Sequence, residues 1–288
     1  MALGANQMTV TTGANMIPTI WSKELIRATE ANLVLAPLVW RFDSDVSDFG
    51  QVIKIPNLSN LVALDKIANT AVTLQAPTES VTTLTVDTHK YVAFLVEDML
   101  KVQSRYDLLS EYTKKASYAL RKAIDSALAN LTTGFSQSAG AYNTTLTTAA
   151  VIAAVNTLNT VDVPMEERFW SMHPKGLADL YTLSDYMRYD GTGVSNLAAE
   201  GRVGSMSGNK KAQGRLYGSD VFVSTQQPKS GNNTSNMYAH KEALALALQK
   251  APRVQSEYKT EYLGNLVVAD VLLGVIETRD AFGVELKA

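Results

Sequence analysis

A glycine-rich stretch at 189–220 is the part of the chain whose composition could best hold a ligand. A phosphate-binding loop has the pattern G-x-x-x-x-G-K-[ST], in which backbone amides surround the phosphate and the lysine reaches it. Five residues after Gly204 stands Asn209 rather than glycine, so Lys210 does not occupy the lysine position of this pattern. The dinucleotide pattern G-x-G-x-x-G is also absent from the sequence. We therefore interpret the stretch as a surface loop.

The sequence does not match the other common catalytic or metal-binding motifs either. The segment GSMSG at 204–208 has Met206 where a nucleophile elbow, G-x-S-x-G, needs serine. The histidines His89, His173 and His240 are far apart, and none has the partner four residues away that a zinc site of the H-E-x-x-H kind requires. The chain has no cysteine, which excludes disulfides, thiolate metal sites and cysteine nucleophiles. The sequence predicts no enzyme, no cofactor and no metal.

The charge balance argues against a general nucleic-acid-binding or membrane protein. Lysine and arginine total 26 against 28 aspartate and glutamate, for a net charge of -2. A basic cluster near an aromatic residue occurs only at 210–217 and is small. The most apolar run, 266–276, is about half the length that a membrane helix needs and contains Asp270. If the chain meets DNA, it does so weakly or by enclosing it.

The middle of the chain, between Gly50 and Gly134, contains no glycine and is expected to form regular secondary structure. Alternation predicts a strand at 51–56 and a return strand at 83–97, with Leu84, Val86, Val92, Phe94 and Val96 on one face. The 26 residues between them, 57–82, would reach about 40 Å as an extended hairpin. A hairpin of that length cannot be covered by its own domain, so it is either disordered or covered by another molecule.

A long amphipathic helix is expected at 104–131, where Ser104 and Asp107 form a capping box. Such a helix would be about 42 Å long. Its charged face is expected to carry i, i+4 pairs together with further lysines: Glu111 with Lys115, Arg121 with Asp125, Lys114 and Lys122. A face of this kind is usually only solvated, and the alternative is a surface that binds a partner or faces DNA.

The rest of the chain predicts an α+β fold class. An uncharged arm covers the first 22 residues, and a short helix is expected at 21–34. Alanines make helix an alternative to strand at 237–249, while His240-Lys241-Glu242 is typical of an edge-strand surface. After Gly134 we expect helices at 147–160 and 174–183, and strands at 168–172, 215–225, 237–249, 255–263 and 265–280, with a short terminal piece, FGVELK.

Several segments in this order resemble one family. They are IPTIWSKELI at 17–26, the return strand and helix at 83–131, GRLYGSDVFVST at 214–225, AHKEALALALQK at 239–250 and EYLGNLVVADVLLGVIETRDA at 261–281. The chain resembles the major capsid proteins of tailed double-stranded-DNA phages, which share the Hong Kong 97 type fold. The resemblance implies an N-terminal arm with a short helix (1–34), an extended β-loop with peripheral-domain strands (35–100), a spine helix of the peripheral domain (101–145), an axial domain (146–250) and C-terminal strands that return to the peripheral domain (251–288).

The resemblance also implies a function. It predicts a structural subunit that self-assembles, as hexamers and pentamers, into an icosahedral shell enclosing a phage genome of double-stranded DNA, assembled in the host cytoplasm and located in the virion capsid. Portal and a separate scaffolding protein are the expected partners, DNA is enclosed without sequence specificity, and no membrane is involved. Many relatives begin with a charged, cleaved scaffolding segment, which is not seen here. An encapsulin-type compartment remains the alternative.

The resemblance finally implies contacts between subunits through the arm, the extended loop, the spine helix and the glycine-rich loop. The residues expected at these contacts are Trp21, Lys23, Glu24, Arg27, Asp65, Lys66, Leu74, Glu79, Lys114, Arg121, Lys122, Arg202, Lys210, Lys211 and Arg215.

Overall fold

The structure, a computed structural model, describes residues 34–46, 50–59, 61–103, 108–183, 186, 203–204, 209 and 212–288. The N-terminal arm, the helix expected at 21–34 except for its last residue, the capping box at 104–107 and most of the glycine-rich loop lie outside these residues. Within the described parts, a few helices pack on extensive sheets, so the expected α+β class is confirmed.

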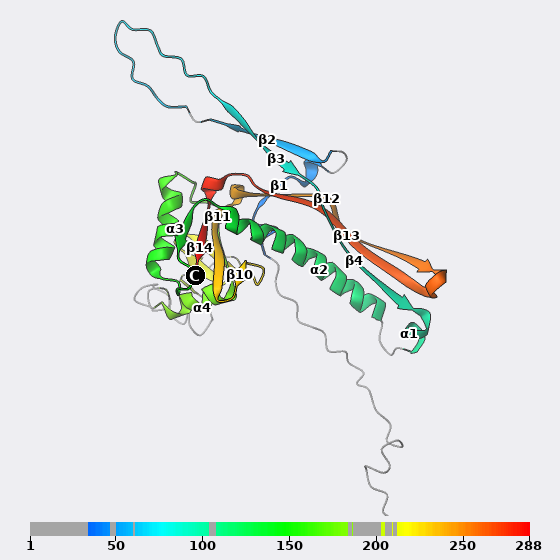
Figure 1. Ribbon diagram of the computed structural model, residues 1–288. Coiled ribbons are helices and arrows are strands. Elements are labelled where there is room, and N and C mark those ends of the chain that lie inside the picture. Colours follow the sequence, from blue (N-terminus) through cyan, green and yellow to red (C-terminus); the bar gives the residue numbers. More distant parts are fainter. Residues whose placement is uncertain are drawn as a thin grey trace, which may run out of the picture.

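A four-stranded sheet, in the order β1-β12-β13-β4, is the longest part of the described fold (Figure 1). β12 and β13 form a long antiparallel pair, and β4 runs antiparallel to the other edge of β13, with Phe94 opposite Val267. β1 is parallel to β12. The strands are β1 Trp40–Arg41, β4 Thr88–Glu97, β12 Leu244–Lys259 and β13 Gly264–Glu277.

Helix α2, Leu108–Asn130, runs along one face of this sheet (Figure 1). Its buried residues follow helical spacing, as the sequence predicted, and Leu120 and Leu128 pack in one core with Val271 of β13. At 23 residues, α2 is about 34 Å long. A separate short helix, α1 Asp98–Gln103, precedes it and was not expected from the sequence.

The second large sheet has eight strands, and α3 and α4 pack against it (Figure 1). Both helices confirm the sequence analysis: Thr147 caps α3 by accepting from the Ala150 N–H, and His173 caps α4. The elements are β5 Ser138–Gly140, α3 Thr148–Thr160, β6 Arg168–Met172, α4 Pro174–Thr182, β7 Val203–Gly204, β8 Gly214–Leu216, β9 Ser219–Val223, β10 Lys229–Ser230, β11 Asn233–His240 and β14 Gly283–Lys287.

Three segments expected as single strands are each divided in two. The segment 215–225 is the hairpin β8–β9, because Tyr217 (φ 47°) and Gly218 (φ 82°) both take the positive φ of a tight turn. The segment 83–97 is divided between β3 and β4, which lie in different sheets. The segment 237–249 is divided by a 3-10 turn, Lys241–Ala243, at which the chain leaves one sheet for the other.

His240 corrects a further expectation, because it lies in the interior rather than on an edge-strand surface. It ends β11, which is hydrogen-bonded to β14 on one side and to β6 on the other. Its side chain is buried, its ring meets Phe282 edge-on, and its Nδ1 accepts from the Glu242 N–H.

The terminal strand β14 lies apart from β12 and β13. It pairs with β11 and β5 in the eight-stranded sheet, whereas β12 and β13 belong to the four-stranded sheet. Gly283 begins β14 at a close approach, because a Cβ there would stand 2.2 Å from the Phe135 ring. The described chain crosses between the two large sheets at three places: 131–137, 241–243 and 278–282.

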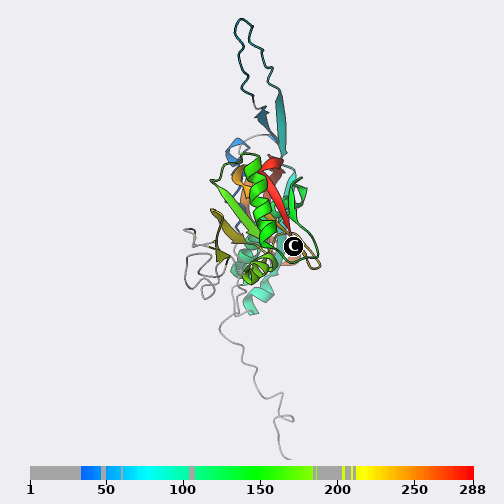
Figure 2. The ribbon, with the colours of Figure 1, turned by 90° about the vertical axis from the view of Figure 1, so that its left-hand side faces the viewer.

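A third sheet is a hairpin that projects away from the rest of the fold (Figures 1 and 2). Its strands are β2 Val52–Leu58 and β3 Glu79–Thr85, paired from Val52 opposite Thr85 to Leu58 opposite Glu79. The expected outgoing strand at 51–56 and the extended excursion that follows it are both confirmed.

Candidate intersubunit surfaces

The hairpin beyond Leu58 stays extended and holds its two sides together with few bonds. The Ser59 N–H donates to the Thr78 carbonyl at 3.2 Å, and the Gln75 side chain bonds both backbone groups of Val62. At the tip, the Thr70 hydroxyl donates to the Ile67 carbonyl at 2.7 Å and closes a turn. These local bonds fix a long, narrow shape with no core of its own.

The apolar side chains of this hairpin are exposed to an unusual degree. Leu74 is 88% exposed and Leu58 is 69% exposed. Further large apolar side chains that are more than half exposed are Leu61, Val62, Leu64, Ile67, Val72 and Val81. Burying one such side chain contributes about 1.5–3 kcal/mol, so a contiguous exposed set of this size marks a contact surface.

The base of the hairpin, in contrast, is firmly attached to the four-stranded sheet. Leu84 and Val86 are buried against Ala245 and Ala247, on the face of the sheet opposite α2. Gly274 of β13 allows this contact, because a Cβ there would stand 2.4 Å from the Thr85 carbonyl oxygen. The projecting part is therefore carried by a packed base.

The chain enters the described fold on the other face, beside α2. Asp125 of α2 is 1% exposed, and its carboxylate accepts the backbone N–H groups of Val34 at 2.7 Å, Leu35 at 3.3 Å and Ala36 at 3.2 Å. The sequence placed Asp125 on the charged surface beside Arg121, and this expectation was wrong. A buried carboxylate needs hydrogen-bond donors, and the residues that follow the N-terminal arm supply them.

The far end of the four-stranded sheet carries another apolar surface, at α1 and the β12–β13 turn. Val102 is 85% exposed, and Met99 and Leu263 are also largely exposed. This end is held together by the Asp98 N–H, which donates to the Leu263 carbonyl at 2.9 Å, and by the Tyr258 hydroxyl, which donates to the Asp98 carboxylate at 2.8 Å. The sequence analysis missed this surface, although the apolar residues Met99, Leu100 and Val102, which directly follow the expected strand, could have indicated it.

An ion pair joins three strands on the face of the four-stranded sheet opposite α2. Asp270 of β13 receives two hydrogen bonds from Arg253 of β12, at 2.7 and 3.0 Å, and lies 3.1 Å from His89 of β4. The bonds from Arg253 lower the pKa of Asp270 to about 2, and His89 acts in the same direction. The cluster holds the strands in register and leaves no site for a metal, since it has a single carboxylate.

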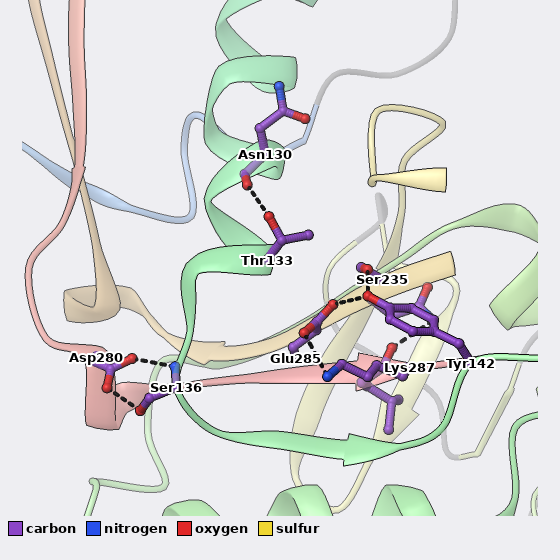
Figure 3. A network of polar contacts seen from close by, with 10 residues as sticks. Asn130, Thr133, Ser136, Tyr142, Ser235, Asp280, Glu285 and Lys287 are labelled. Atoms are coloured by element: carbon purple, nitrogen blue, oxygen red, sulfur yellow. Dashed lines mark hydrogen bonds and ion pairs between the residues drawn. The ribbon is translucent and has the colours of Figure 1, made fainter. Parts of the chain in front are cut away.

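Polar contacts also fasten the junction between the two large sheets. The Ser136 N–H donates to the Asp280 carboxylate at 2.7 Å, and its hydroxyl donates to the same group (Figure 3). Thr278 donates its N–H to the Ala243 carbonyl at 2.9 Å. The crossings at 131–137 and 241–243 are thus both hydrogen-bonded to the crossing at 278–282.

A carboxyl pair, Glu277 and Asp280, lies at the same junction. Burial, together with the hydrogen bond and the charge of Asp280, raises the pKa of Glu277 to about 7. Burial opposes the ionisation of Asp280 as well, but hydrogen bonds from Ser136 and Glu277 leave the Asp280 pKa below its usual value. The pair therefore holds its proton on Glu277 below about pH 7, while Asp280 is ionised.

A second polar network lies beside the junction, on β14 (Figure 3). The Tyr142 hydroxyl donates to the buried Glu285 carboxylate at 2.6 Å and meets the Ser235 hydroxyl at 2.9 Å. Lys287 lies 3.5 Å from Glu285 and 5.3 Å from the Tyr142 ring centre. Each buried polar group has its partner, so the network stabilises the sheet rather than forming a reactive site.

Comparison with solved structures gives matches over nearly the whole chain. A structure from Mycobacterium phage Che8 covers 94% of this chain and 97% of its own, with a TM-score of 0.80 and 21% identity. The capsid structure of cyanophage P-SCSP1u covers 99% and 96%, with a TM-score of 0.77 and 16% identity. The mature capsid of bacteriophage PhiM1 covers 94% and 91%, with a TM-score of 0.74 and 13% identity. The chain has a phage capsid fold.

The Hong Kong 97 type fold expected from the sequence is thereby confirmed. No protein-family model and no curated protein matches the chain significantly. Because the identities are low, the capsid fold is established through three-dimensional shape rather than through sequence. Among the described residues, none of the helices is long and apolar enough to span a membrane.

The contact residues expected from the sequence are placed on this capsid fold as follows. Asp65, Lys66, Leu74 and Glu79 lie on the hairpin, and all four are exposed. Lys114, Arg121 and Lys122 lie on the exposed face of α2, and Arg215 lies on β8. The structure does not bring these groups together into one cluster. The remaining expected residues, Trp21, Lys23, Glu24, Arg27, Arg202, Lys210 and Lys211, lie outside the described residues.

Proposed function

We propose that this chain is the structural subunit of an icosahedral shell that encloses a phage genome of double-stranded DNA. The observation that carries the proposal is the hairpin: on a chain with a phage capsid fold, it exposes a row of large apolar side chains that no other described residue of the chain covers. We infer that a second copy of the chain covers this row. The phage structures named above favour this shell over an encapsulin compartment.

The two large sheets define the units of this proposed subunit. The four-stranded sheet with α2 corresponds to a peripheral domain, and the eight-stranded sheet with α3 and α4 corresponds to an axial domain. Because β14 pairs with β11, we assign 283–287 to the axial unit, whereas β12 and β13 belong to the peripheral unit. The glycine-rich loop at 189–214 is proposed to lie near the axis of the hexamers and pentamers.

Overlap between subunits supplies the stability of the proposed shell. A stable protein interface buries about 1,200–2,000 Å². The hairpin and the apolar end of the four-stranded sheet offer each subunit two separate contact surfaces, so no single interface has to be strong. Such contacts suit a chain that occupies several nearly equivalent positions in one shell.

The remaining partners follow from the same proposal. Portal and a separate scaffolding protein would direct assembly in the host cytoplasm, and the finished shell would form the virion capsid. DNA would be enclosed without reading its sequence, since the net charge of -2 provides no general attraction to it. The subunit would act without enzymatic activity, cofactor or membrane.

Electron microscopy of the purified full-length protein tests the proposal. We expect closed shells or capsomer rings, together with fast-sedimenting particles in the ultracentrifuge. A stable monomer of 31.2 kDa at every protein concentration would overturn it. Particles that hold a cargo enzyme rather than DNA when isolated from their natural host would favour the encapsulin alternative.

A further inference from the structure

The exposed face of α3 carries no charged side chain. Residues 126–161, which include the whole of α3, contain no Asp, Glu, Lys, Arg or His. At the charged fraction of the whole chain, 19%, a segment of this length would carry about seven charged residues. Helical spacing and exposure define the uncharged face of α3, which consists of Ala149, Ile152, Ala153, Asn156 and Thr160.

This absence of charge distinguishes α3 from the other α-helices of the described residues. α1 carries Asp98 and Lys101, α2 carries lysine, arginine and glutamate, and α4 carries Lys175 and Asp179 within only nine residues. The outer side of a solvated helix normally carries charged groups. The uncharged face of α3 has instead the composition of the middle of a protein interface, where charged residues are depleted.

The rest of the described fold leaves this face uncovered. One side of α3 packs on the eight-stranded sheet, where Ala154 and Leu158 are buried in the core. Figure 2 shows α3 in front of that sheet, with the hairpin rising above it. Ile152 is 48% exposed, so a large apolar side chain stands on the outer side of the helix.

The uncharged face of α3 continues toward the hairpin. Val161, which directly follows α3 and is exposed, lines a surface pocket of about 580 Å³ together with Asn57 and Leu58 of the hairpin. Leu58 is the first large exposed side chain of the apolar row that extends along the hairpin. One neighbouring molecule can therefore cover the hairpin row, this pocket and Ile152 together.

The charged groups at the same pocket do not interrupt this surface. Arg279 lies 3.2 Å from Glu242, and the Asp280 carboxylate accepts the Ser136 N–H, so both are bonded within the fold. Asp162, the first charged residue after the uncharged segment, is exposed at the pocket. A charge at the border of an apolar surface is usual for an interface, whose rim is polar.

We propose that the uncharged face of α3 is buried by a second copy of the chain, in continuity with the hairpin contact. This inference rests on the proposed shell function, in which each copy contacts several neighbours. A second copy is the occupant because the face adjoins the row that the hairpin presents to a neighbouring subunit. The face also has no charge with which to attract an acidic or a basic partner. Covering it removes no ion from water, so apolar area and shape supply the contact.

The first test introduces one charge on the face. Ala153→Glu places a carboxylate where a neighbouring copy would remove it from water, and we expect the protein concentration needed for assembly, measured by light scattering, to rise about tenfold or more. Glutamate is a good helix former, so the melting temperature of the unassembled subunit should stay close to that of the unaltered protein. Ala153→Ser, which adds no charge, should assemble nearly as the unaltered protein does.

Ala178→Glu is the matched control. Ala178 is an exposed alanine of α4, a helix on the same sheet, and it lies between Lys175 and Asp179. The same substitution is thus made where charge is already present, and it should leave the assembly concentration nearly unchanged. Normal assembly by Ala153→Glu, or an equal rise for both glutamate variants, would overturn the inference.

The second test identifies what covers the face. A photoreactive p-benzoylphenylalanine replaces Ile152, and the purified, assembled protein is irradiated. We expect a product that contains two chains, with the attachment on the second copy located by mass spectrometry. A product with the mass of one chain would show that the chain covers its own face, and the absence of any cross-linked product would show that nothing covers it. Either result would overturn the inference.

The two tests also separate this inference from the proposed function. If the unaltered protein forms shells but position 152 gives no product between chains, the α3 contact fails while the shell function stands. If the unaltered protein forms only small closed oligomers, and Ala153→Glu dissociates them, the shell function fails while the α3 contact stands. A monomer at every protein concentration would overturn both.

Discussion

The Asp125 carboxylate, buried on α2, accepts a hydrogen bond of 2.7 Å from the backbone N–H of Val34. It also receives the N–H groups of Leu35 and Ala36. One side chain therefore satisfies three successive backbone donors and fixes residues 34–36 against α2.

Asp125→Asn should destabilise the folded protein. The amide retains one acceptor oxygen but presents N–H groups to donors, so at least one buried N–H loses its partner. We expect the free energy of unfolding to fall by about 1–3 kcal/mol in urea denaturation. Lys122→Ala, an exposed change on the same helix, should alter it by no more than about 0.5 kcal/mol. Equal effects of the two changes would contradict this account.

Gly274→Ala should loosen the base of the hairpin. The new Cβ would stand 2.4 Å from the Thr85 carbonyl oxygen, so β3 must move away from β13. We expect a loss of about 1–3 kcal/mol in the free energy of unfolding. Hydrogen exchange should show faster amide exchange in β2 and β3 than in β6. Unchanged exchange in the hairpin would show that the sheet relaxes elsewhere. Ala93→Ser on exposed β4 is the control.

Leu74→Gln should impair assembly without affecting the fold. The side chain is 88% exposed, so its replacement should change the free energy of unfolding of the unassembled subunit by less than about 0.5 kcal/mol. If a neighbouring subunit buries Leu74, each 1.4 kcal/mol lost raises the protein concentration needed for assembly about tenfold. Light scattering measures this concentration. Thr73→Gln, at the adjacent exposed position, should have little effect, and an equal effect would remove Leu74 from the contact.

The ion pair of Asp270 with Arg253 predicts that the stability of the fold depends on pH in the acid range. The pKa of Asp270 is lowered to about 2 in the fold, so its ion pair contributes stability above the unfolded-state pKa of about 3.9, and this contribution is lost as pH falls toward 2. Asp270→Asn should therefore lower the melting temperature clearly at pH 6 and progressively less below pH 4. A difference that stays constant from pH 6 to pH 2 would contradict the assignment.

Glu277 predicts the opposite dependence of stability on pH. Its pKa is raised to about 7, so the fold favours the protonated form and loses stability as pH rises from about 4.5 through 7. Glu277→Gln, which mimics the protonated side chain, should raise the melting temperature at pH 8 and change it little at pH 4. Scanning calorimetry at the two pH values measures this. An equal gain at both would show that the carboxylate charge is not responsible.

Local patterns predicted the elements that depend on near neighbours in sequence. Helix α3 and strand β6 were predicted because the spacing of apolar residues is a local signal. The hairpin was found because a run of this length cannot be buried by its own domain. Hydrophobic alternation alone could not show that the strand at 237–249 breaks at 241–243, since the break serves a change of sheet and not a change of pattern.

The candidate surfaces were predicted less completely. The exposed row around Leu74 followed from the excursion, but the burial of Asp125 depends on residues about 90 positions earlier in the chain. Helical spacing placed Asp125 beside Arg121 on the surface, and only the tertiary path of 34–36 decides otherwise. The apolar end at Val102 was missed because it joins α1 to the β12–β13 turn, which are distant in sequence.

The three crossings between the large sheets also govern when the chain can fold during synthesis. β4 finds its partner only after β13 has been made, about 170 residues later, and β11 pairs with β14, which is made after β13. Pairings this distant are slow to form, and α2 has no finished sheet to cover until then. A ribosome-bound or truncated chain would therefore present its hairpin on an unfinished body, and only a fully synthesised subunit would be competent to join others.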